Sequence, residues 1–141
     1  MIKLNKYITE AWSGVKKHTN NANIEAWCDK IGIKKYNIND EGKIDVEGNV
    51  NLNKSNFKEL PYKFGNVSGW FDLSECKNLI SLKNCPDKVG LYFSCSDCAQ
   101  LDSLEGCPKK VGSSFYCYGC KIKFTEEEVR SLCKVKVDAV V

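Results

Sequence analysis

The sequence of 141 residues has few of the residues on which catalysis usually depends. Histidine occurs once, at His18 beside Lys16 and Lys17, so a catalytic triad, a zincin motif and a histidine acid/base pair all lack their central residue. Neither a P-loop nor a GxGxxG motif occurs, and the acids from Glu126 to Glu128 suit a helix start better than a catalytic pair. We therefore expect a protein that is not an enzyme and binds no cofactor.

Long apolar runs and long basic runs are missing as well. No stretch approaches the roughly 18 apolar residues of a membrane span, and the first residues lack the apolar core of a signal peptide. No Lys/Arg run is longer than a pair, and residues 41–141 hold fourteen basic and fourteen acidic residues. A duplex-binding protein usually carries a dense basic face. These absences predict a cytoplasmic protein with no membrane contact, for which nucleic acid is a disfavoured partner.

Cysteine, by contrast, is abundant, with nine residues. The number is odd and no export signal accompanies it, which favours reduced thiols over a disulfide framework. In a reducing compartment most of these cysteines are expected to serve as small, buried apolar residues.

The main feature present is a repeat of 22 residues. One copy reads VSGWFDLSECKNLISLKNCPDK and the next reads VGLYFSCSDCAQLDSLEGCPKK. A third copy leaves the register at Thr125, and a degenerate earlier copy covers GNVNLNKSNFKELPYKFGN. A fixed period of about 20 to 29 residues predicts a solenoid, in which each unit buries its apolar side against its neighbours. The recurring positions are Val67, Val89 and Val111, then Phe71, Phe93 and Phe115, and then Cys76, Cys98 and Cys120.

Within a repeat, the alternation of apolar and polar residues predicts one short strand. Phe71 and Leu73 point inward, while Trp70, Asp72 and Ser74 point outward. Equivalent strands are expected to stack in parallel, about 4.8 Å apart. The return segment NCPDKVG combines Pro and Gly in a few residues, so it is expected to be irregular or 3₁₀.

The pattern apolar-x-apolar-x-x-Cys-x-x-Leu-x-x-Leu, seen from Phe71 to Leu82, resembles the cysteine-containing class of leucine-rich repeats over residues 44–124. More loosely, the layout of a helical lead, an LPYKFG entry and GCPKKVG turns looks like short repeat proteins encoded by bacteriophages. The first resemblance implies a parallel β ladder whose exposed face binds other proteins. The second implies, as partner, a host or defence protein in the host cytoplasm that the chain inhibits.

The expected fold is therefore an α/β repeat, a short leucine-rich-repeat-like solenoid of about four units at residues 41–124. Residues 1–40 are predicted to form an N-terminal helical cap and residues 125–141 a capping helix and tail, because the open ends of a solenoid need covers. The tail KVKVDAVV is compatible with an added strand or with a docked segment. The helical signals are apolar spacing at Ile8, Ala11, Trp12 and Val15, the stripe of Ile24, Trp27 and Ile31 before Gly32, the capping box from Thr125 to Glu128, and the apolar side of Val129, Leu132 and Cys133.

The outward face of the predicted ladder is the candidate binding site, because it gathers Trp and Tyr among polar residues. Exposed Trp and Tyr often carry the binding energy of interfaces, which favours a protein partner. Two alternatives stay open: the rings simply stack along the ladder, or they stack on bases of single-stranded nucleic acid whose phosphates contact the lysines of residues 1–40. The predicted binding residues are Trp70, Asp72, Glu75, Tyr92, Ser94, Asp97, Tyr116 and Tyr118, with Ser74 and Ser114 on the same face.

A third alternative is a zinc-stabilised structural protein. The spacing of Cys95, Cys98, Cys117 and Cys120 matches two CxxC pairs of a structural zinc site. The repeat offers another explanation, because the position equivalent to Cys95 one unit earlier is the apolar Leu73. Buried thiols are therefore the preferred interpretation, with no bound metal.

Overall fold

The computed structural model describes residues 20–141 of the chain, which divides into two units, Met1–Lys34 and Lys35–Val141. In the first unit residues 20–31 are helical, and the helix stops at Gly32 as predicted. Gly32 has φ of +84°, and the amide of Ile33 donates to the carbonyl of Cys28 at 2.9 Å, so the last carbonyls of the helix are satisfied. The predicted apolar positions Ile8, Ala11, Trp12 and Val15, and also His18, lie outside the described residues.

The apolar stripe of this helix differs from the predicted one. Ile24 and Cys28, four residues apart, are its buried side chains, whereas Trp27 and Ile31 are half-buried. A spacing of four residues keeps two side chains on one helix face, and Trp27 sits at the margin of that face. The prediction is therefore right for Ile24, and it missed Cys28.

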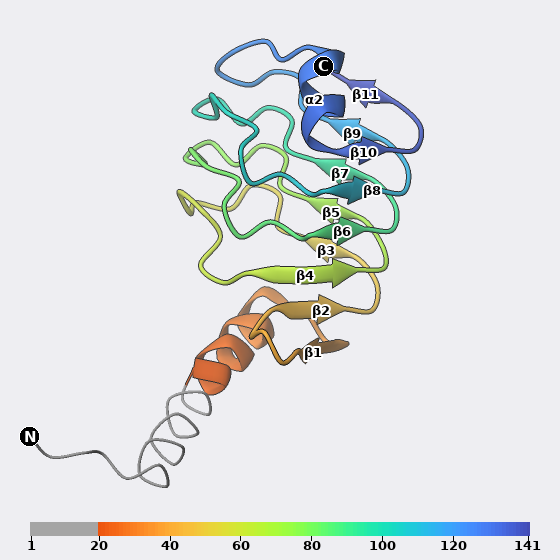
Figure 1. Ribbon diagram of the computed structural model, residues 1–141. Coiled ribbons are helices and arrows are strands. Elements are labelled where there is room, and N and C mark those ends of the chain that lie inside the picture. Colours follow the sequence, from red (N-terminus) through yellow and green to blue (C-terminus); the bar gives the residue numbers. More distant parts are fainter. Residues whose placement is uncertain (1–19) are drawn as a thin grey trace, which may run out of the picture. The chain divides into compact units, whose positions relative to one another are not determined.

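The second unit is a β solenoid whose successive circuits, here called rungs, each add one strand to each of two sheets (Figure 1). All strand pairs are parallel except β1 with β2. Sheet A has six strands in the order β1 (Tyr36–Ile38), β2 (Ile44–Val46), β4 (Phe64–Val67), β6 (Lys88–Val89), β8 (Lys110–Val111) and β10 (Lys134–Val135). Sheet B has five in the order β11 (Ala139–Val140), β9 (Phe115–Tyr116), β7 (Phe93–Ser94), β5 (Phe71–Asp72) and β3 (Val50–Asn51).

The parallel ladder predicted from the strand pattern is sheet B. The segment NCPDKVG, expected to be irregular, instead contains the sheet A strand β6. Val89 is buried and Lys88 is exposed, so even this two-residue strand alternates between core and solvent. The prediction for NCPDKVG is therefore wrong at Lys88–Val89, whereas residues 95–109 contain neither a helix nor a strand.

Phenylalanines form a column through the solenoid, as the repeat predicts. Phe71 pairs in register with Phe93, and Phe93 with Phe115. The ring centroids lie 6.1 Å and 5.0 Å apart, and all three side chains are fully buried. Phe64 of sheet A meets Phe71 edge-on at 5.1 Å, which joins the two sheets across the core.

A column of thiols runs parallel to the phenylalanines, and each thiol donates a hydrogen bond to a backbone carbonyl of the previous rung. The Sγ atom of Cys76 lies 3.3 Å from the carbonyl oxygen of Leu52. The corresponding distances are 3.2 Å from Cys98 to Leu73 and 3.2 Å from Cys120 to Cys95. All nine cysteines are free thiols, and all are buried except the half-buried Cys120.

The C-terminal segment adds one more rung. Thr125 and Glu128 form the predicted capping box at the start of α2 (Glu126–Leu132). Val129 and Cys133 are buried as predicted, but Leu132 is 45% exposed, because it lies on the outer side of the helix. The strands β10 and β11 then extend both sheets, so the tail is an added pair of strands. Across the described residues, no helix combines the length and apolar character needed to cross a membrane.

Candidate interaction surfaces

The outward face of sheet B carries a continuous row of aromatic side chains. The rings of Trp70 and Tyr92 stack with centroids 5.5 Å apart and planes only 7° from parallel. The ring of Tyr116 meets Tyr92 edge-on at 5.9 Å. Tyr118 follows two residues later and is 46% exposed. We call Trp70, Tyr92, Tyr116 and Tyr118 the aromatic surface.

The third aromatic residue of this row, Tyr116, does not occupy the repeat position of Trp70 and Tyr92. Trp70 and Tyr92 occupy equivalent repeat positions, but the third copy has Ser114 there. Tyr116 instead pairs in register with Ser94, which pairs with Asp72. Because small residues occupy both serine positions, Tyr116 can lean against Tyr92 without a clash. Ser94 and Ser114 are 6% and 7% exposed, so the expectation that they face solvent is wrong.

Carboxylates border the aromatic surface. Asp72 is half-buried and accepts hydrogen bonds at Oδ1 from the amide and hydroxyl of Ser74, which fixes its orientation. Glu75 and Asp97 are exposed at equivalent turn positions, with φ of +57° and +56°. Within residues 20–141 none of these three carboxylates forms an ion pair. The carboxylates at the edge of the aromatic surface therefore carry negative charge that no ion pair neutralises in this part of the chain.

Burial raises the pKa of Tyr92, and the nearby charge of Asp72 and the Tyr116 hydroxyl raise it further. The Tyr92 hydroxyl is consequently protonated at neutral pH and can act as a hydrogen-bond donor. The two ends of this side chain have different roles, since the ring packs on its neighbours while the hydroxyl stays polar.

The outer face of sheet A forms a second surface, a shallow groove of about 1190 Å³. Lys88, Lys110 and Lys134 line it and pair in register on β6, β8 and β10. All three are exposed, and none is ion-paired in the described part of the chain. We call them the lysine column. Sequence reasoning missed it, although a lysine precedes the recurring valines Val89 and Val111 and also precedes Val135.

Two glycines that line this groove allow successive rungs to stack closely. A Cβ atom on Gly90 would lie 2.1 Å from the carbonyl oxygen of Ser68, and one on Gly112 would lie 2.1 Å from that of Gly90. Backbones of successive rungs therefore approach too closely for any side chain. Gly90 and Gly112 are therefore needed for the stacking of the rungs beside the lysine column.

The paired cysteines are part of the repeat's interior. Cys95, Cys98 and Cys117 are buried, and the thiol of Cys120 donates to the Cys95 carbonyl. Burial raises the pKa of Cys117 to about 12, so this thiol is protonated at neutral pH when no metal ion is bound. In residues 20–141 no group of three or more His, Cys, Asp or Glu side chains is arranged to hold a metal ion. The arrangement gives the zinc alternative no support.

Comparison of the chain with models of protein families, with curated proteins and with solved structures finds no match. The β solenoid is therefore known from its own strands and register. The likeness to leucine-rich repeats and to bacteriophage proteins stays a prediction from residue spacing.

Proposed function

We propose that the protein is a non-catalytic binding module that holds a partner protein against its aromatic surface. The observation that carries the proposal is the stacked row of Trp70, Tyr92 and Tyr116, which is half-buried and ends at the exposed Tyr118. Aromatic side chains of this kind supply a large contact area together with a polar tip.

The fixed packing of the rings in the aromatic surface favours tight binding of a partner. Because each ring packs on its neighbour, these side chains lose little rotamer freedom when a partner covers them. The acidic edge formed by Asp72, Glu75 and Asp97 favours a partner whose contact patch is apolar at its centre and basic at its rim.

The same geometry disfavours single-stranded nucleic acid as the ligand of this surface. Trp70 and Tyr92 each cover one face of the other's ring, so a base cannot insert between them. The unpaired carboxylates of Glu75 and Asp97 would repel phosphates. In keeping with the likeness to bacteriophage proteins, we propose that the partner is a host regulatory or defence protein that is blocked or held.

The test begins with a partner captured from the native host and then purified, so that its affinity can be measured by calorimetry. Tyr92→Ala is expected to weaken binding by about 30-fold or more, as the loss of a central aromatic anchor does. Ile80→Ala is the matched control, because Ile80 is 52% exposed and lies outside the aromatic surface. Equal affinities of wild type and the Tyr92 variant, with an unchanged circular dichroism spectrum, would contradict the proposal.

A further inference from the structure

The lysine column is an electrostatic feature that the aromatic surface does not explain. Lys88 pairs in register with Lys110, and Lys110 with Lys134, so the backbones that carry these charges lie about 4.8 Å apart. Like charges directly opposite one another destabilise a sheet. In the first rungs the equivalent positions are Asp45 and Asn66, so the fold does not require lysine there.

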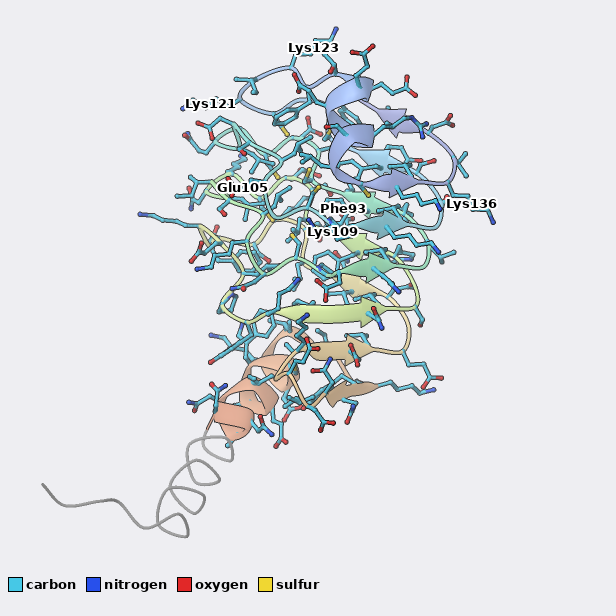
Figure 2. All side chains as sticks on the ribbon, viewed as in Figure 1. Phe93, Glu105, Lys109, Lys121, Lys123 and Lys136 are labelled. Atoms are coloured by element: carbon cyan, nitrogen blue, oxygen red, sulfur yellow. The ribbon has the colours of Figure 1, made fainter. Side chains whose placement is uncertain are left out.

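No neighbouring acid neutralises the column. The four acidic residues in ion pairs of the described region, Glu41, Asp87, Asp102 and Glu126, bind Lys43, Lys63, Lys121 and Arg130. Lys136 also lines the groove. In Figure 2 it lies at the right of the solenoid, opposite Glu105 and Lys121 at the left. The basic half of the groove thus presents four unpaired ammonium groups, one each on β6, β8 and β10 and one, from Lys136, directly after β10.

We infer that this groove binds an acidic, extended polypeptide segment, as a second site separate from the aromatic surface. The lysine column spans about 10 Å, which an extended peptide covers with about three residues. Acids at alternate positions of such a peptide point to the same side, so two of them face the column together. Gly90 and Gly112 also line the groove and carry no side chain that would hinder such a peptide.

Charge and composition favour a polypeptide over nucleic acid at this site. Asp45 and Glu47 line the opposite end of the groove together with Lys35, and the net negative charge of that end would repel a phosphate chain that continued along it. A short acidic segment ends before it reaches them. The lining of the basic half contains no aromatic side chain on which a base could stack. The five lysines that line the groove, Lys35 included, also offer fewer contacts than the 6 to 10 phosphates that duplex-binding proteins typically neutralise.

The experiment is fluorescence anisotropy with a labelled peptide of alternating Glu and Gly, at low ionic strength. The triple variant Lys88→Gln/Lys110→Gln/Lys134→Gln is expected to lose about tenfold or more in affinity, because three charges are removed from one short site. The matched control Lys77→Gln/Lys83→Gln/Lys123→Gln removes the same charge from exposed lysines elsewhere and is expected to bind within about twofold of wild type. Lys123 lies well away from Lys136 in Figure 2.

Three results would overturn the inference: equal losses in the two triple variants, no binding of the peptide by wild type, or tighter binding of an oligothymidylate of equal charge than of the peptide. Thermal unfolding separates binding from folding, because removing cross-strand repulsion should leave the column variant at least as stable as wild type. Retained peptide binding by Tyr92→Ala distinguishes this site from the aromatic surface.

Discussion

The thiol of Cys98 lies 3.2 Å from the carbonyl oxygen of Leu73, one rung away, and donates a hydrogen bond to it. The Leu73 amide donates in the other direction, to Ser94. Both residues are fully buried, so an unpaired carbonyl there would cost its desolvation free energy. This relationship explains why cysteine recurs every 22 residues: the position needs a small apolar side chain that is also a donor.

We predict that Cys98→Ala lowers the free energy of unfolding by about 2 kcal/mol, because it removes the donor to Leu73 as well as buried volume. Cys98→Ser keeps a donor and should lose less. Cys85→Ala is the matched control, since Cys85 is equally buried but its thiol has no side-chain hydrogen bond in the described region. Urea denaturation measures all three, and equal losses at Cys85 and Cys98 would contradict a role for the hydrogen bond.

A second prediction concerns Asp87, whose two carboxylate oxygens bind Lys43 at 3.0 Å and Lys63 at 2.9 Å. Burial alone would raise the pKa of Asp87, but the hydrogen bonds and charges of Lys63 and Lys43 outweigh it and lower the pKa. Its contribution to stability is therefore present above the ordinary pKa of 3.8 and is lost as the pH falls through the lowered value.

Asp87→Asn should consequently lower the free energy of unfolding by about 1 kcal/mol at neutral pH, a value limited by solvent screening of these half-exposed groups. The difference from wild type should shrink as the pH falls below 3.8 and through the lowered pKa of Asp87, because the carboxyl group then becomes protonated in the folded state as well. Asp102→Asn serves as control, because Asp102 meets the exposed Lys121 only at 3.7 Å and should have no measurable effect. A difference that persists in acid would contradict the proposed cause.

The third prediction is loss of stability in alkali. Burial raises the pKa of Cys107 from 9.0 to about 11, and that of Cys133 from 9.0 to about 12. The unfolded chain releases these protons first, so the stability they contribute is complete below pH 9 and declines as the pH rises through 11 to 12. Equilibrium urea denaturation between pH 8 and pH 11 measures the decline, and Cys107→Ala should reduce its slope. An unchanged slope in that variant would contradict the assignment.

The repeat predicted sheet B and its phenylalanine column correctly, because a period of 22 and an alternation of two fix which residues superimpose. The sequence analysis did not predict the sheet A strand Lys88–Val89. One exposed and one buried residue are too few to show an alternating pattern in a sequence. The hydrogen bonds of sheet A join strands of different rungs, such as β6 and β8, and only the three-dimensional structure shows them.

In the candidate sites, too, the sequence predicted some residues and missed others. Trp70 and Tyr92 were identified from the outward strand pattern, and their stacking follows from equivalent positions. The shift to Tyr116 depends on Ser94 and Ser114 being small, which is a packing effect between rungs. The sequence did not reveal the lysine column because Lys88 and Lys110 are 22 residues apart in the chain and form no continuous basic run. In the solenoid those two residues are immediate neighbours.

The antiparallel strand β1 has a consequence for self-association. A row of unpaired amides and carbonyls at the end of a ladder is a template for another chain, and identical molecules that add head to tail grow into filaments. At this end of sheet A, however, the outermost strand Tyr36–Ile38 runs against all the others. An incoming strand that runs in the direction of the other rungs would have to pair antiparallel with β1, so the parallel hydrogen-bonding pattern of sheet A does not continue beyond this strand.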